Sequence, residues 1–151
     1  MTVRPLTPGE VDLAHSVYRD SIDLAPVTIR RRKWFPLQPR EVAMAPRGHI
    51  HFHPDASAWS EDFSREDADR RGLFIHELCH VWQHQRGICL PLARHPFCRY
   101  SYTIKPGWKL PRYGLEQQAE IVRHAYLLRE GRIVEGAPAL TQYDSILRIF
   151  R

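Results

Sequence analysis

The sequence predicts one α+β domain that spans residues 1–151. Three observations point to it: two long segments have helical hydrophobic periodicity, a proline-punctuated segment of short alternating runs precedes them, and no repeat or low-complexity stretch interrupts the chain. Of the 151 residues, 43% are hydrophobic and 26% are charged, which suits a chain that folds around one core of ordinary size. An intrinsically disordered chain is therefore excluded.

The first helix is predicted to begin after Thr7 and to run to about Arg19. Thr7 suits the N-cap, Pro8 suits the first helical position, and Glu10 is placed to complete a capping box. One face of this helix would carry four apolar side chains: Val11, Ala14, Val17 and Tyr18. The helix should therefore pack against the core through that face.

Three short strands are predicted next, in the ranges 27–34, 41–45 and 49–53, with prolines in the turns between them. We expect these strands to form a small antiparallel sheet. The last one alternates apolar residues with three histidines that share a face: His49, His51 and His53. We interpret that face as solvated or cleft-lining, and favour contact with substrate over a second metal site.

The principal helix is predicted from Asp67 to about Gln85. Acidic residues at its start suit the positive end of the helix dipole, and Gly87 is a typical C-terminal stop. Between residues 73 and 82 this helix is apolar on nearly every side except at three positions: His76, Glu77 and His80. The pattern is typical of a buried helix that carries a polar site.

A proline-rich connection, residues 88–112, follows the principal helix, and connections of this length are often functional. A second strong helix is predicted over 114–129, with Gly131 as its stop. Its apolar stripe consists of Leu115, Ala119, Val122 and Tyr126. The range 138–150 is predicted to form a short final amphipathic helix.

The net charge is +5, with a pI near 9.4. Such a balance can favour nucleic acid or an anionic surface, but we interpret the basic run 30–33 as a solvated face. No apolar run approaches the roughly 18 residues that a membrane helix needs, so we expect no membrane partner.

The three cysteines, Cys79, Cys89 and Cys98, make an odd count that fits a reducing compartment. A Cys89–Cys98 bridge is sterically conceivable, and Cys79 is expected to be a buried, inert thiol. The first residues lack an apolar signal core, so we expect a cytoplasmic protein, with export by a machine that reads no N-terminal signal left open.

Residues 76–80 read His-Glu-Leu-Cys-His, which is the HExxH pattern. On a helix the two histidines stand about 40° apart around the axis and about 6 Å apart along it, so both imidazoles can reach one ion. Glu77 projects beside His76, where its carboxylate can act as general base on a metal-activated water. The pattern predicts a zinc site held by His76 and His80, over the alternative of a hydrogen-bonded core cluster.

A catalytic zinc needs a third protein ligand, and Glu116 is our candidate. Glu116 and Glu120 lie on one side of the second helix and flank its apolar stripe. We expect Glu116 to bind the metal and Glu120 to orient His76 from outside the ligand set. The two glutamates could exchange roles, and the alternative is that both face solvent. His84 lies about 12 Å along the helix from His76 and is interpreted as a surface residue.

These motifs resemble those of the gluzincin, or thermolysin-like, zinc metallopeptidases. The resemblance rests on His76-Glu77-x-x-His80 and on Glu116-x-x-x-Glu120. It implies a minimal zincin-like fold, zinc bound by His76, His80 and Glu116, Glu77 as base, and a supporting carboxylate at Glu120, where that group usually has Asp. It also implies a strand that binds extended peptide beside the cleft, which we assign to residues 49–53. The chain further resembles short bacterial HExxH proteins labelled Vgr-related, a label that hints at association with a secretion system.

The favoured function is zinc-dependent hydrolysis of a peptide bond in a peptide or protein substrate. One alternative is a catalytically inactive, zincin-like module that binds metal within a larger, secretion-associated assembly. Another is a basic nucleic-acid-binding protein that uses residues 30–33, for which the sequence contains no recognised motif. The residue that stabilises the oxyanion stays open among four candidates: Tyr100, Tyr102, Tyr113 and His124.

Overall fold

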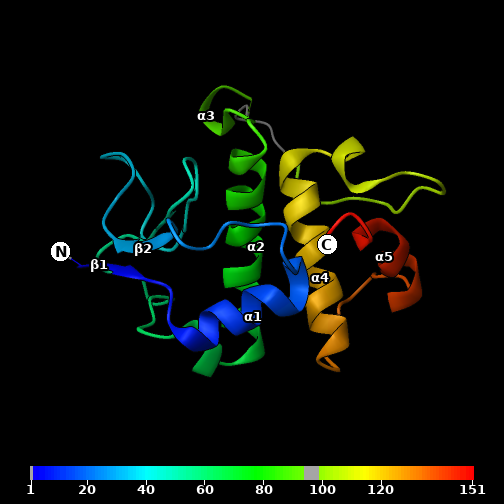
Figure 1. Ribbon diagram of the computed structural model, residues 1–151, viewed down its shortest axis with the longest axis horizontal. Helices are drawn as coiled ribbons and strands as arrows, with labels where there is room; N and C mark the ends of the chain where they lie inside the picture. Colours follow the sequence, from blue (N-terminus) through cyan, green and yellow to red (C-terminus); the bar gives the residue numbers. More distant parts are fainter. Residues whose placement is uncertain (1, 94–98) are drawn as a thin grey trace.

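The computed structural model describes residues 2–93 and 99–151. Within this part the chain has five α-helices and a three-stranded sheet, which is the predicted α+β class. Helix α2 (Ala68–Gln85) stands in the middle, with the sheet on one side and helices α4 (Leu115–Arg129) and α5 (Leu140–Leu147) on the other (Figure 1). None of the described helices combines the length and hydropathy of a membrane-crossing segment.

The sheet has the order β1-β2-β3 and is mixed, not antiparallel as predicted. Strand β1 (Thr2–Pro5) pairs antiparallel with β2 (Thr28–Arg31), whereas β3 (Ile50–His51) pairs with β2 in parallel. The sequence did not predict β1 at all, and the strands predicted over 27–34 and 49–53 are shorter than expected. The long connection between β2 and β3 allows the chain to return in the same direction, which a tight hairpin would forbid.

The strand predicted over 41–45 is absent from the described structure, where only Met44 forms an isolated antiparallel bridge with His51. A side chain takes over the hydrogen bonds that a strand would need. The buried amide of Gln38 donates to the backbone carbonyl oxygens of Val42 and His51, at 2.8 and 3.1 Å. This segment is therefore held in an irregular conformation that lies close to α2.

Helix α1 (Pro8–Tyr18) confirms the predicted start signal. The Thr7 hydroxyl accepts the backbone N–H of Glu10, and the Glu10 carboxylate accepts the backbone N–H of Thr7, which completes the capping box. The face that carries Ala14, Val17 and Tyr18 is buried. The helix therefore packs against the core as expected.

Helix α2 confirms the predicted principal helix. Its N-cap is Asp67, whose carboxylate accepts the backbone N–H of Arg70, and Gly87 follows the last turn with a φ of +88°. Every residue from 74 to 83 is buried. The ring of Phe74, on α2, stacks on that of Phe63, which stacks in turn on that of Phe52, just after β3. The ring centroids are 5.8 Å apart for Phe74–Phe63 and 5.4 Å apart for Phe63–Phe52. A polar site on α2 is therefore enclosed on several sides.

The rest of the chain follows the predicted outline with shorter elements. A 3-10 turn (Phe63–Arg65) precedes α2, the short helix α3 (Leu90–Ala93) and a second 3-10 turn (Leu110–Arg112) lie in the predicted long connection, and α4 and α5 match the two predicted C-terminal helices. Cys79 is fully buried, as expected. Cys98, and with it the Cys89–Cys98 pairing, lies outside the described residues.

A buried ion pair joins β1 to α1. The Arg4 guanidinium makes two hydrogen bonds to the Glu10 carboxylate, at 2.7 and 3.0 Å, and the Glu10 side chain is completely buried. The same carboxylate accepts the backbone N–H of Phe63 at 2.9 Å. Glu10 of α1 therefore connects β1 to the 3-10 turn that precedes α2.

Replacing Arg4 by Met should destabilise the fold by about 3–5 kcal/mol, because it leaves the Glu10 carboxylate buried without its cation. Urea unfolding measures this change. The matched control is Arg132→Met, which removes an exposed pair with Asp69 and should cost less than about 1 kcal/mol. Equal effects of the two substitutions would contradict the role of the buried pair.

Candidate metal centre

The two motif histidines point from the middle of α2 towards the first turn of α4. The Nε2 atoms of His76 and His80 lie 3.2 and 2.9 Å from one carboxylate oxygen of Glu116. All three residues are buried, at 8%, 7% and 3% exposure. Their donor atoms lie within 4.8 Å of one another, which suits a single shared ion. The structure thus brings together the three residues that the sequence singled out as metal ligands, while ligation itself stays a prediction.

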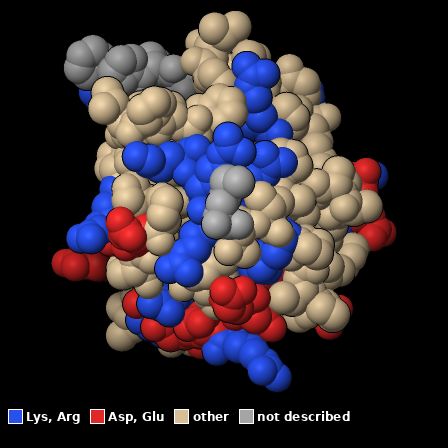
Figure 2. All heavy atoms as spheres, turned by 90° about the vertical axis from the view of Figure 1, so that its left-hand side faces the viewer, with Lys and Arg blue, Asp and Glu red and all other residues tan. Residues whose placement is uncertain are grey.

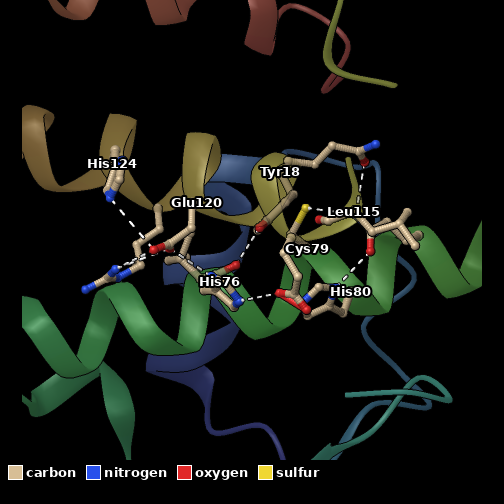
Figure 3. A network of polar contacts seen from close by, with 12 residues as sticks. Tyr18, His76, Cys79, His80, Leu115, Glu120 and His124 are labelled. Atoms are coloured by element: carbon tan, nitrogen blue, oxygen red, sulfur yellow. Dashed lines mark hydrogen bonds and ion pairs between the residues drawn. The ribbon is translucent and has the colours of Figure 1, made fainter. Parts of the chain in front are cut away.

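Glu120 lies one turn further along α4 and contacts the other nitrogen of His76. Its carboxylate is 3.0 Å from His76 Nδ1 and 3.2 Å from the guanidinium of Arg123. Figure 3 shows the Glu120 carboxylate between His76 and His124, whose Nε2 is 4.0 Å away. This is the position from which Glu120 was predicted to orient His76.

A glutamine that the sequence analysis missed holds the second histidine. The Gln83 amide nitrogen donates to the backbone carbonyl of Leu115 at 3.0 Å and to the side-chain oxygen of Gln118 at 2.9 Å. Its amide oxygen is therefore turned to His80 Nδ1, at 2.8 Å, and accepts a hydrogen bond from that nitrogen. Gln118 is fixed in turn because its amide nitrogen donates to the Tyr113 carbonyl.

This amide chain determines which nitrogen of His80 carries a proton. Because Nδ1–H donates to Gln83, the Nε2 lone pair of a neutral His80 faces the Glu116 oxygen 2.9 Å away. Two lone pairs at that distance need a cation between them, either a proton or a metal ion. The donor set therefore fits a metal ion that prefers nitrogen and oxygen ligands, such as zinc.

In the metal-free cluster, the carboxylates of Glu116 and Glu120 favour the charged form of His76. Burial lowers the pKa of His76, but its contacts with Glu116 and Glu120 outweigh burial and raise that pKa to about 10. Burial raises the pKa of Glu120, but the bond from His76 outweighs it and lowers the pKa to about 2. The pKa of Glu116 is lowered in the same way by both histidines. Without metal, His76 is thus protonated at neutral pH.

A cavity of about 370 Å³ opens onto the cluster. His76, Glu77, His80 and Glu116 lie at its floor, and its walls come from the segment 34–46, from α3 and from Tyr100. The Glu77 side chain is buried, with the residue at 4% exposure, and lines this cavity beside both histidines. The arrangement gives a small substrate access to the donor atoms and to one further carboxylate.

Of the four candidates for oxyanion stabilisation, Tyr100 is the one that lines this cavity. Its ring lies beside the His76 imidazole, with centroids 6.2 Å apart and planes 17° apart. Tyr102 shares hydrogen bonds with His124 and Tyr143, and the Tyr113 hydroxyl accepts the backbone N–H of Lys105. Those side chains are engaged outside the cavity.

None of the residues 49–53, which were predicted to contact substrate, lines the cavity. His51 is buried in the sheet against the ring of Trp34, and burial lowers its pKa. The adjacent irregular segment, Val42–Pro46, lines the cavity instead. His84, which was interpreted as a surface residue, is partly buried and is not part of the metal-ligand group found among the described residues.

Two comparisons with known proteins bear on this site. The type VI secretion system spike protein VgrG2b of Pseudomonas aeruginosa is 39% identical over 155 residues, which cover 97% of this chain. The solved effector domain of Pseudomonas aeruginosa VgrG2b matches with a TM-score of 0.77 at 36% identity, over 94% of this chain and 80% of that one. The chain belongs to the family of the VgrG2b effector domain.

The VgrG2b match supports the Vgr-related resemblance noted in the sequence. The chain spans 15% of the length of the VgrG2b spike protein. No protein-family profile matches the chain.

Metal binding should release at least one proton near neutral pH, because His76 must lose the proton that it carries in the metal-free state. Affinity should therefore rise at least about tenfold for each pH unit between about pH 6 and 8, below the raised pKa of His76. Zinc titration calorimetry in buffers of different ionisation enthalpy measures the released proton. Binding without proton release and without pH dependence would refute the assignment of the proton to His76.

Gln83→Leu should weaken zinc binding about 10–100-fold, because His80 Nδ1 loses its acceptor and the imidazole its fixed orientation. A competition titration against a chromophoric chelator gives the dissociation constant. Gln85→Leu is the control on the same helix, since the Gln85 side chain contacts Asp23 and neither histidine. Unchanged affinity in Gln83→Leu would show that the amide chain does not support the site.

Proposed function

We propose that this chain is a zinc-dependent metallopeptidase domain of the HExxH type that serves as an effector module of a type VI secretion spike. The observation that carries the enzymatic part is the convergence of His76, His80 and Glu116 at the floor of a cavity that Glu77 also lines. Membership in the VgrG2b effector-domain family supports the secretion part.

Three residues would hold the metal in this proposal: His76, His80 and Glu116. A zinc ion there would supply a Lewis acid that lowers the pKa of a water and polarises a carbonyl. The Glu77 carboxylate would take the proton of the attacking water and pass it to the leaving amine nitrogen. Tyr100 would donate its hydroxyl hydrogen bond to the carbonyl oxygen as negative charge develops there.

The spacing of the two downstream glutamates supports the gluzincin type within this proposal. Glu116 faces both histidines, and Glu120 contacts His76 from outside the donor set. Glu120 stands where the gluzincins usually have Asp, and its longer side chain still reaches His76. The proposed substrate is a peptide or protein segment that enters between residues 42–46 and α3. In this proposal the chain is made in the cytoplasm and exported with a spike. This agrees with the sequence, which left open export by a machine that reads no N-terminal signal.

The second candidate is an inactive metal-binding module, favoured by the comparisons because their names specify a secretion spike and an effector domain and no catalytic activity. In that case the same three residues would hold a structural ion. Both candidates predict metal binding, and only the first requires Glu77 to act as a base.

Replacing Glu77 by Gln should lower peptide hydrolysis at least about 100-fold while zinc content stays unchanged, because the substitution removes the base and no ligand. Cleavage sites in a random peptide library, read by mass spectrometry, provide the assay. Glu135→Gln, a change at an exposed glutamate, is the control and should remain fully active. A zinc-loaded parent that cleaves nothing would support the inactive module.

A further inference from the structure

The rim of the cavity carries most of the exposed large apolar side chains in the described part of the chain. Six of eight belong to the two segments that flank the cavity: Trp34, Phe35, Leu37, Val42, Leu92 and Tyr100. Leu37 and Leu92, one from each segment, are 81% and 85% exposed. Single exposed apolar residues are ordinary, but a cluster of this kind around a cavity marks an interaction surface.

Both segments lie in cationic stretches of the chain, and the one acidic residue within 34–46 is Glu41, whose carboxylate accepts hydrogen bonds from Ser57. The sequence has no Asp or Glu in the ranges 24–40 and 86–115, and these ranges hold eleven Lys and Arg residues. Within the described residues, Arg32 and Lys33 are exposed and form no ion pair with a carboxylate. Figure 2 shows Lys and Arg side chains gathered in a band across the face on which the sheet lies, with acidic atoms below it.

This combination of charge and apolar tips selects one kind of partner. A nucleic acid would neutralise the cations but leave Leu37 and Leu92 in water. A bilayer with anionic lipids accommodates both kinds of side chain. The apolar side chains insert at the boundary between headgroups and acyl chains, while the cations contact the lipid phosphates. We propose that the rim of the cavity docks onto an anionic membrane surface through Leu37 and Leu92, with Arg32 and Lys33 against the headgroups.

Docking in this orientation turns the mouth of the cavity towards the bilayer, because both leucines belong to segments that line it. The expectation of no membrane partner rested on the lack of a spanning segment, which surface docking does not require. The proposed surface shares no residue with the metal ligands or with Glu77. Membrane binding is therefore independent of the proposed hydrolysis, and either can fail without the other.

The test is flotation of the folded chain with vesicles of phosphatidylcholine alone or with 30% phosphatidylglycerol added. We expect binding to the anionic vesicles, at least about tenfold weaker binding to the neutral ones, and loss of binding in high salt. Leu37→Asp/Leu92→Asp should reduce partitioning at least about tenfold, whereas Ile133→Asp, a control at a residue that is 95% exposed elsewhere, should not.

Reversing the charge of the basic residues provides a second, independent test of membrane binding. Arg32→Glu/Lys33→Glu should lower partitioning at least about tenfold, and Arg148→Glu/Arg151→Glu, two exposed cations at the C-terminal end, should change it less than about twofold. Equal partitioning of the parent to neutral and anionic vesicles would overturn the proposal. Salt-sensitive binding to duplex DNA or polyglutamate without vesicle binding would also overturn it and assign the surface to a soluble polyanion.

Discussion

The burial of the Glu116 carboxylate between two histidines constrains the rest of this fold. Removing a carboxylate from water costs several kcal/mol unless cations and hydrogen-bond donors replace the water. Here both Nε2 atoms converge on one oxygen, which requires the first turn of α4 to sit level with the middle of α2. The α2–α4 pairing is thus set by a polar contact as much as by apolar packing.

Several features of the chain serve that alignment. The amide chain from Gln83 to Gln118 links α2 to the start of α4 and uses backbone carbonyls at Tyr113 and Leu115 as fixed acceptors. On the other side of α2, the stacked phenylalanine rings and the Arg4–Glu10 pair hold the sheet and α1 in place. The cluster is therefore preorganised, with each imidazole held at its second nitrogen by a partner outside the donor set.

Local sequence signals were sufficient for the helices and for the centre of the site. The capping box at Thr7, the stop at Gly87 and the HExxH spacing each depend on residues within a few positions of one another, so α1, α2 and the two histidines followed directly. Glu116 and Glu120 could be selected because an acidic pair beside an apolar stripe is costly to bury without partners. The sheet was predicted poorly, because its parallel pairing and the use of Gln38 in place of a strand depend on contacts between distant segments. Gln83 was missed for the same reason, although a polar amide within an otherwise buried helix was a signal that could have identified it.

The most direct test of this account is the metal content of the purified, untagged chain, measured by mass spectrometry for the parent, His80→Ala and Glu116→Ala. The account predicts about one zinc ion per parent chain, loss of zinc in His80→Ala, and weakened zinc retention in Glu116→Ala. Each substitution removes one of the three protein ligands, and the two ligands that remain bind zinc less tightly. Failure of the folded, metal-free parent to take up zinc that is offered to it would contradict the account. The cluster between α2 and α4 would then be a hydrogen-bonded core network and no metal centre.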